Sequence, residues 1–231
     1  MTRAARTTRL PRALLPVLLL VLTGAAAALA AQTAGQTAPP TVESERDRWN
    51  RVFTLQPPNI RTEANQFLVQ VAANLKPGAA IDVGMGFGRN ALHLARTGWT
   101  VTGVDISDVG VQRAQEQAQK EKLPLTAIRV DALEFDYGRD KWDLVAAMYM
   151  GGITIKLADR LTDALKPGGV LVVEHFLRKP EERLGFLPGE LPKAFPRLEV
   201  LRYAEEDGRP DYAQQTPGRV VRFLARKRPA P

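Results

Sequence analysis

The sequence predicts an α/β fold in which helices cover both faces of a doubly wound, mostly parallel sheet. Three observations predict it. Short apolar runs rich in β-branched residues alternate with stretches of helical periodicity between residues 80 and 174. The first run enters a glycine-rich turn that leads directly into a helical stretch, and the length of 231 residues suits one domain of this class. Strands that alternate with helices pair in parallel, so the sheet is expected to be mostly parallel.

The expected elements follow one another from residue 43 and are separated by clusters of Pro and Gly at 56–59, 76–78 and 166–169. Helices are expected over 43–53, 61–75, the stretch between Gly88 and Gly98, 109–122 and 153–165, and strands over 80–83, 100–105, 126–130, 143–148 and 170–174. Two later apolar runs, 198–203 and 219–225, have no helix between them, only the polar stretch 204–217. We therefore expect these two runs to form a pair of strands that departs from the parallel pattern.

The first 31 residues differ in composition from the rest of the chain. Four arginines between residues 3 and 12 precede an apolar run over 14–22, and a small-residue stretch ends in Ala28-Leu29-Ala30. This order is typical of a secretory signal with an A-x-A cleavage site, although an uncleaved membrane anchor and a transit peptide remain alternatives. We expect 1–31 to be a signal peptide or anchor, 32–42 a linker and 43–231 the folded domain, exported or periplasmic. A start site assigned too early would instead leave the protein cytoplasmic.

Composition excludes several classes of function. The chain has no cysteine, which excludes disulfides, thiolate metal sites and cysteine nucleophiles, and we predict no metal. The formal charge is +7, of which the leader arginines supply four, and the remaining +3 is too small to indicate a nucleic-acid partner. We expect a monomer or dimer that contacts a membrane only through an uncleaved N-terminal segment.

The glycine-rich turn lies within the stretch from Ala80 to Asn90. Glycine can adopt positive φ and lets a ligand approach the bare backbone, and the N–H groups of the following helix offer donors. A dinucleotide-binding loop reads G-x-G-x-x-G, but here Gly84, Gly86 and Gly88 are evenly spaced and Arg89 follows them. The spacing therefore indicates a polar ligand other than a dinucleotide.

The next predicted strand ends in Asp105, seventeen residues after the last glycine of the turn. A carboxylate at this place has the two acceptor oxygens that a ribose diol requires. Alternatively, Asp105 only caps the helix that begins near Ser107 and Asp108, although Ser107 is a suitable N-cap residue by itself.

An Asp two residues ahead of G-x-G-x-G resembles motif I of the class I methyltransferases that use S-adenosylmethionine, and the resemblance extends from about residue 48 to 228. Gly88-Arg89-Asn90-Ala91-Leu92 with Leu94-Ala95 is similar to the small tellurite-resistance type. The resemblance implies a Rossmann-like sheet of seven strands that ends in an antiparallel pair, and S-adenosylmethionine as the cofactor.

The resemblance also implies which residues contact the cofactor. Asp82 and the three glycines would surround its methionine half, Asp105 would bind the ribose, and Ile106 would lie against the adenine. Asp131 would accept a hydrogen bond from the adenine amino group, and the backbone of Ala132 would contact the adenine ring. The alternative is that Asp131 is only a turn residue. The implied cofactor-binding set is Asp82, Gly84, Gly86, Gly88, Asn90, Asp105, Ile106, Asp131, Ala132 and Met148.

On the acceptor side we expect His175 and Tyr149, which directly follow two strands, to be catalytic residues, with His175 as a candidate general base. We expect 43–53 and 178–196 to cover the acceptor site, with Tyr149 and His175 beneath them and Trp49 closing the site from above. Tyr149 and Trp49 are the expected substrate contacts. The alternative is that Trp49 is a hydrophobic clasp and that His175 is a hydrogen-bonded residue at a strand end.

The predicted function is methyl transfer from S-adenosylmethionine to a small-molecule acceptor. Enzymes that methylate nucleobase or glutamine nitrogens resemble this chain less, because they carry Asn-Pro-Pro-Tyr where it reads Met148-Tyr149-Met150-Gly151. A protein acceptor and a non-catalytic cofactor-binding protein remain alternatives. Export conflicts with this function, because S-adenosylmethionine is made in the cytoplasm.

Overall fold

The computed structural model describes residues 42–55, 61–211 and 218–229. The predicted leader, nearly all of the predicted linker, the Pro-Pro break at 56–59 and the end of the polar stretch 204–217 lie outside the described residues. Within the described part of the chain, no helix is both long enough and apolar enough to cross a bilayer.

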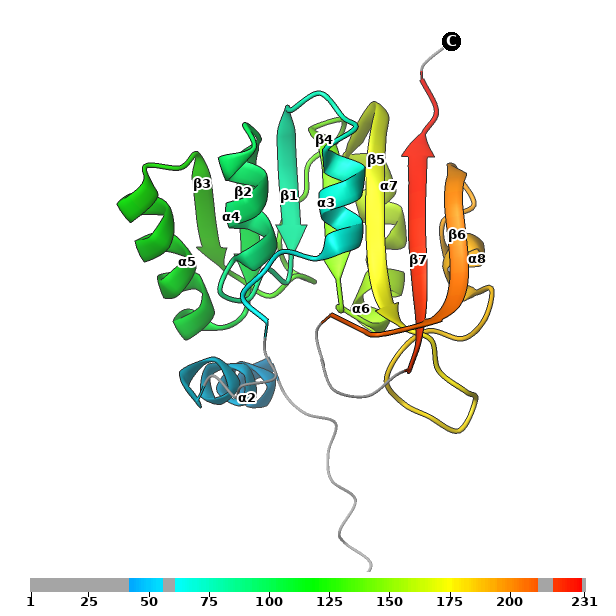
Figure 1. Cartoon of the computed structure of the whole chain (residues 1–231), viewed down its shortest axis with the longest axis horizontal. Coiled ribbons are helices and arrows are strands. Elements are labelled where there is room, and N and C mark those ends of the chain that lie inside the picture. Colours follow the sequence, from blue (N-terminus) through cyan, green and yellow to red (C-terminus); the bar gives the residue numbers. More distant parts are fainter. Residues whose placement is uncertain (1–41, 56–60, 212–217, 230–231) are drawn as a thin grey trace, which may run out of the picture. The chain divides into compact units, whose positions relative to one another are not determined.

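Seven strands form one sheet in the order β3-β2-β1-β4-β5-β7-β6 (Figure 1). The strands are β1 (Ala79–Val83), β2 (Thr100–Asp105), β3 (Leu125–Arg129), β4 (Trp142–Met148), β5 (Leu165–Phe176), β6 (Leu198–Gly208) and β7 (Gly218–Lys227). The first five pair in parallel, whereas β7 lies antiparallel between β5 and β6. The predicted fold class, including the antiparallel C-terminal pair, is confirmed. We call the edge of the sheet where β1, β2, β4 and β5 end the carboxyl edge.

Helices cover both faces of this sheet. One face carries α3 (Gln66–Ala72), α4 (Arg89–Arg96) and α5 (Asp108–Glu121), and the other carries α6 (Gly152–Lys156), α7 (Ala158–Ala164) and α8 (Glu190–Ala194). The helix α2 (Val42–Leu55) lies at the carboxyl edge and packs on α5 (Figure 1).

The two faces arise from the alternation of side chains along each strand. In β4, Val145 and Ala147 belong to the core under α7, whereas Leu144 and Ala146 belong to the core under α3 and α4. Because both faces are buried, the strand reads as a continuous apolar run rather than as an alternating one.

Two predicted helices differ from the observed ones. The helix expected over 61–75 begins only at Gln66, because the Asn65 side chain takes the N-cap position and accepts from the Leu68 N–H at 2.9 Å. The helix expected over 153–165 is divided at Leu157 into α6 and α7.

The turn expected at 166–169 is instead part of β5. The register between β4 and β5 shifts after the Trp142–Leu165 pair, so these residues form an irregularity inside the strand. Gly168 has a φ of +85° there, which explains why the Pro-Gly-Gly sequence looked like a turn.

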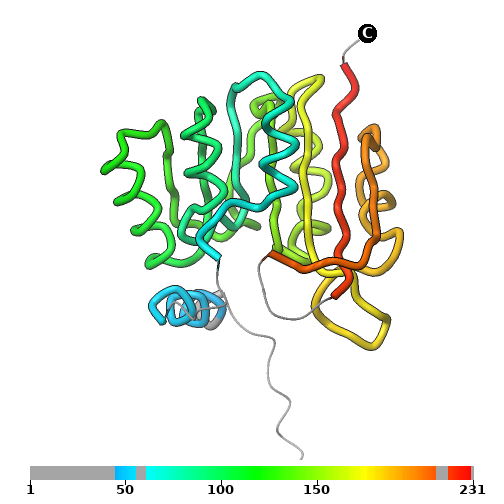
Figure 2. The backbone as a smooth tube through the Cα atoms, in the orientation of Figure 1, coloured from blue at the N-terminus to red at the C-terminus, as the bar shows by residue number. Residues whose placement is uncertain are grey.

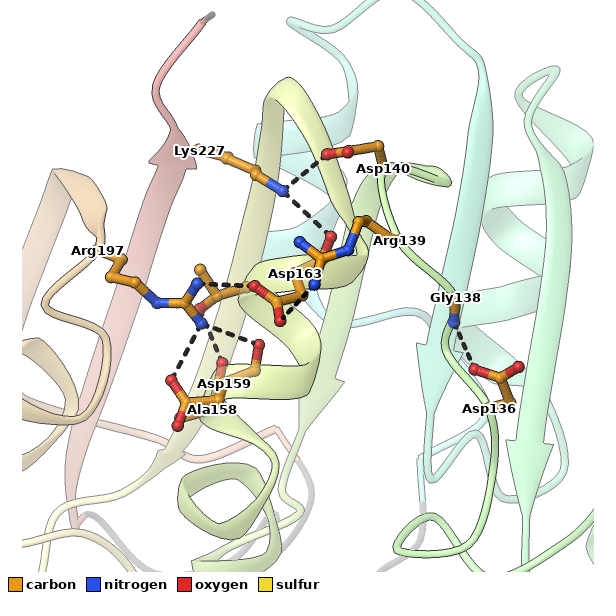
Figure 3. Close-up of polar contacts among 10 residues, drawn as sticks. Asp136, Gly138, Arg139, Asp140, Ala158, Asp159, Asp163, Arg197 and Lys227 are labelled. Atoms are coloured by element: carbon orange, nitrogen blue, oxygen red, sulfur yellow. Dashed lines mark hydrogen bonds and ion pairs between the residues drawn. The ribbon is translucent and has the colours of Figure 1, made fainter.

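Ion pairs fasten α7 at the edge opposite the carboxyl edge (Figure 3). The Arg197 guanidinium contacts the carboxylates of Asp163 at 2.7 Å and Asp159 at 3.0 Å, and Lys227 Nζ lies 2.8 Å from Asp140 Oδ1. Because these side chains are exposed or partly exposed, each pair stabilises the fold by no more than about 1 kcal/mol.

Phe223→Ala tests the packing around the antiparallel pair. Phe223 is fully buried in β7, with its ring centroid 5.7 Å from that of Phe195 and 6.3 Å from that of Tyr203. The resulting cavity should lower the free energy of unfolding by about 3–5 kcal/mol in urea denaturation. The control Leu184→Ala, at a side chain that is 64% exposed, should change it by no more than about 0.5 kcal/mol. Equal losses in the two variants would contradict the packing described.

Candidate functional site

The turn between β1 and α4 holds its three glycines in the left-handed region. Their φ values are +69° at Gly84, +59° at Gly86 and +84° at Gly88. The Gly86 N–H donates to Asp105 Oδ2 at 2.8 Å, so the turn is held against the end of β2. Most side chains would be strained in this backbone, and the turn therefore presents bare main chain at the carboxyl edge.

Asp82, on β1, is 1% exposed, and its Oδ2 atom has no hydrogen-bond partner among the described residues. Burial raises the pKa of this carboxyl to about 7, while the nearby Arg89 acts in the opposite direction. A buried carboxylate oxygen without a donor is costly, because its desolvation is not compensated. The site is therefore suited to a ligand that brings a donor, and a cationic one above all.

Asp105 is also buried, and each of its oxygens already accepts one backbone N–H. Oδ2 accepts from Gly86 and Oδ1 from Ser107, both at 2.8 Å. Burial raises the pKa of Asp105, and these N–H groups oppose the rise. Ser107 is the N-cap of α5 and accepts from the Gly110 N–H at 3.1 Å. Asp105 therefore does not replace Ser107 as the cap, and its remaining lone pairs are available to a diol.

The other predicted cofactor residues lie along the same edge. Asp131 Oδ1 accepts from the Leu133 N–H at 2.8 Å, which is the turn geometry of the simpler alternative, while Ala132 and Met148 are buried. Ile106 is partly exposed. Asn90 Oδ1 accepts from the Asn65 N–H at 2.8 Å and so ties the chain before α3 to the start of α4.

The helix α2 lies over the glycine turn. The Asn50 side chain bonds Ser107 Oγ at 2.7 Å, and the Arg113 guanidinium donates to the Phe53 carbonyl at 2.7 Å. A Cβ on Gly86 would lie 3.0 Å from the Phe53 ring, so this ring rests on the turn. The sequence predicted the helix but not Phe53 and Asn50, whose only sequence signal was the amphipathic pattern of 43–53.

Glu174, at the end of β5, is a buried carboxylate that sequence analysis did not single out. It is 2% exposed, and it accepts from Asn65 Nδ2 and Tyr149 Oη at 2.7 Å each and from Arg222 Nε at 2.6 Å. Donors from three separate segments offset the cost of burying the charge. Only the tertiary structure brings these residues together, so no local pattern could have predicted the network.

Tyr149 belongs to this network and has a φ of +61°, which is rare for a residue with a side chain. Its hydroxyl also accepts from the Asp211 N–H at 3.0 Å, and Arg89 pairs with the Asp211 carboxylate at 3.1 Å. Burial and the neighbouring Glu174 raise the pKa of Tyr149. Figure 2 shows the chain before α3 and the chain after β6 both running along the carboxyl edge.

His175 is 1% exposed and lies among aromatic rings, with its ring centroid 5.5 Å from that of Tyr149 and 5.2 Å from that of Phe186. Its Nδ1 accepts from the Phe176 N–H at 2.7 Å, which assigns the proton of the neutral ring to Nε2. Burial lowers the pKa of His175 to about 4. His175 Nε2 is buried and has no hydrogen-bond partner among the described residues, and with the proton on it this arrangement does not equip His175 to act as a general base.

Trp49 stacks on Phe53 with ring centroids 5.5 Å apart, and the Arg48 guanidinium lies 4.5 Å from its ring centroid. The contacts of α2 join it to α5 and the glycine turn. Of the two predicted covers, the 178–196 segment reaches His175, through Phe186. The structure thus brings His175 and Tyr149 together but places Trp49 on the cofactor side.

A groove of about 340 Å³ lies elsewhere, between α3 and the strands β5, β6 and β7. Its lining is mainly apolar and includes Phe67, Val71 and Leu224. The unpartnered buried oxygen of Asp82 and the glycine turn are at the carboxyl edge instead, where ligands of open parallel sheets bind. We therefore place the functional site at the carboxyl edge.

Comparison with known proteins agrees with this placement. Residues 80–169, which include the glycine turn, Asp105, Asp131 and Met148, match the family model described as a methyltransferase domain. This segment of the chain is therefore similar to a methyltransferase domain. S-adenosylmethionine is the cofactor of this domain class.

Relatives and solved structures resemble the methyltransferase domain over different lengths. The ribosomal protein L11 methyltransferase of Geotalea uraniireducens is 35% identical over 111 residues, which are 47% of this chain and 35% of that protein. The chain therefore spans about a third of the length of this relative.

Two solved structures share the fold of the methyltransferase domain. The [4+2]-cyclase SpnF has a TM-score of 0.68 at 19% identity, with 84% of this chain and 98% of that chain covered. Magnesium protoporphyrin IX methyltransferase from Synechocystis PCC 6803 was solved with bound S-adenosylmethionine. It has a TM-score of 0.60 at 19% identity, with 84% of this chain and 100% of that chain covered.

The residues of the site fit S-adenosylmethionine. Its ammonium group would supply the donor that the buried Asp82 Oδ2 lacks, and the glycine turn leaves room for close approach to the backbone. Asp105, at the end of the neighbouring strand, would hold the ribose hydroxyls.

Asp82→Asn tests this assignment because it should weaken ligand binding without destabilising the free protein. Loss of a charge-assisted hydrogen bond should weaken S-adenosylhomocysteine binding roughly ten- to a hundredfold in calorimetry. The free protein should not lose stability at pH 8. Because the pKa of Asp82 is raised from 3.8 to about 7, the folded state holds a proton that the unfolded chain releases, so this carboxyl makes unfolding easier as pH rises from about 4 to 7. The variant lacks that penalty.

The matched control is Asp163→Asn, at the opposite edge of the sheet, which should leave the affinity unchanged. If Asp82→Asn lowered the melting temperature at pH 8 and left the affinity intact, Asp82 would be a structural residue.

Proposed function

We propose that the protein transfers a methyl group from S-adenosylmethionine to a small-molecule acceptor. The observation that carries the proposal is the glycine turn flanked by Asp82 and Asp105 at the carboxyl edge of a methyltransferase domain. Bound S-adenosylmethionine supplies a methyl group on a sulfonium that is already reactive. The chain then has to align the acceptor and exclude water, and alignment alone can contribute ~7–11 kcal/mol.

Two observations support a small acceptor. The segment after β4 reads Met148-Tyr149-Met150-Gly151 and lacks the Asn-Pro-Pro-Tyr sequence of enzymes that methylate nucleobase or glutamine nitrogens. One solved structure that this chain covers over its full length is named for magnesium protoporphyrin IX, a small molecule. The relative named for a ribosomal protein is matched over only 35% of its length, so it gives weaker support for a protein acceptor.

The residues beside the acceptor act by packing and orientation in this proposal. The Tyr149 hydroxyl is held by Glu174 and the Asp211 N–H, and the neutral His175 ring lies beneath Phe186. Both side chains keep the end of β4 in place and exclude water, and neither removes a proton. Acceptors that are nucleophilic without a strong base are therefore favoured.

A second candidate is a protein that binds the cofactor without transferring its methyl group. The observation that favours it is the name of the SpnF structure, a [4+2]-cyclase, which shares this fold with a TM-score of 0.68. The lack of an available general base at Tyr149 and His175 is compatible with this candidate too.

The proposal is tested with the full chain, trideuteromethyl-labelled S-adenosylmethionine and a cell extract divided by size into small molecules and proteins. We expect S-adenosylhomocysteine to form and the label to appear in the small-molecule fraction by mass spectrometry. Asp105→Ala should reduce labelling roughly ten- to a hundredfold at limiting cofactor, whereas Asp159→Asn should not.

The other outcomes would each support a different function. Label in proteins alone would support a protein acceptor. Cofactor binding without any S-adenosylhomocysteine would contradict methyl transfer and support the second candidate.

We further propose that the protein is exported by its N-terminal leader, on the arginine, leucine and A-x-A order of residues 3–30. Intact-mass analysis of the native protein should find a chain that begins near Ala31 or Gln32. A cytoplasmic species that retains the four arginines would contradict export, and it would also remove the question of how the cofactor reaches the enzyme.

A further inference from the structure

The Met150 side chain occupies the space beside the first glycine of the turn. A Cβ built on Gly84 would lie 1.8 Å from Met150 Sδ and 2.8 Å from its Cε, so the thioether rests directly on the glycine backbone. Any side chain at position 84 would collide with it. Met150 thus lies inside the turn that forms the methionine end of the cofactor site.

The position of Asp82 makes this contact significant. Asp82 precedes Gly84 by two residues, and its Oδ2 is buried without a partner among the described residues. A ligand whose methionine end presses on the Gly84 backbone would need the space beside this glycine. In the structure the Met150 thioether occupies that space, so such a ligand would require Met150 to move.

Met150 is suited to such a movement. It is partly exposed, it is unbranched, and it lies between two residues of positive φ, Tyr149 at +61° and Gly151 at +55°. Met85 offers a direct comparison within the same domain. Its sulfur would lie 2.1 Å from a Cβ on Gly103, but Met85 is 4% exposed and belongs to the core under α3 and α4.

We propose that Met150 is a displaceable thioether that fills the methionine end of the cofactor site in the free protein and swings out when S-adenosylmethionine binds. The inference rests on the cofactor assignment and the proposed function above. Displacement would free the Gly84 backbone for the methionine end of the cofactor.

Nuclear magnetic resonance of the full chain labelled at its methionine methyl groups tests the movement without any variant. The chain has four methionines, so the spectrum is simple, and Met150→Leu and Met85→Leu assign the two signals. In the free protein the Met150 methyl should show a nuclear Overhauser effect to the Gly84 α-protons. Saturating S-adenosylhomocysteine should abolish it, whereas the corresponding Met85 to Gly103 effect should persist.

Calorimetry with S-adenosylhomocysteine gives an independent test. Met150→Ala removes the group that must be displaced, so it should bind roughly tenfold more tightly than the parent. Met85 belongs to the same turn, but its side chain lies in the core, so Met85→Ala removes no group that must be displaced and should lower the melting temperature without tightening binding.

The outcomes separate this inference from the proposed function. If the parent binds S-adenosylhomocysteine while the Met150 to Gly84 effect survives and Met150→Ala binds no more tightly, Met150 is a fixed wall and the inference is wrong. If neither the parent nor the variants bind, the cofactor assignment fails and the inference fails with it.

Discussion

The close approach of main chain to main chain at the glycine turn is the constraint on which the site depends. Gly86 donates to Asp105 on one side and lies under the Phe53 ring on the other, and a Cβ on Gly110 would stand 2.8 Å from the Gly86 carbonyl. The end of β2, the start of α5 and the helix α2 are therefore all positioned against Gly86, which has no side chain. A side chain at position 86 would press on the Phe53 ring of α2.

Two buried carboxylates at the carboxyl edge differ in their hydrogen bonding: Glu174 accepts hydrogen bonds from several donors, whereas one oxygen of Asp82 accepts none from the described residues. Glu174 accepts from Asn65, Tyr149 and Arg222, and this network holds the chain before α3 and the antiparallel pair against the end of β4. Asp82 Oδ2, by contrast, has no donor among the residues that the structure describes. The satisfied group stabilises the framework, and the unsatisfied one is where binding free energy can be gained.

Sequence patterns predicted much of the fold because both faces of the sheet are buried and the strands read as apolar runs. The strand Thr100–Asp105 was predicted to the residue, and the glycine spacing identified the domain class. The late start of α3 and the irregularity in β5 were missed, because a side-chain cap at Asn65 and a register shift beside Trp142 override the local pattern. Glu174, Phe53 and Met150 were also missed, since their roles depend on neighbours distant in sequence.

The central claim is that the carboxyl edge binds S-adenosylmethionine rather than a nicotinamide dinucleotide, since the evenly spaced glycines and the unpartnered Asp82 suit an amino-acid ammonium group and not a pyrophosphate. Isothermal titration calorimetry of the full chain with S-adenosylmethionine and with NAD tests it most directly. The account predicts saturable one-to-one binding of S-adenosylmethionine and no heat from NAD. Binding of NAD without binding of S-adenosylmethionine would contradict it.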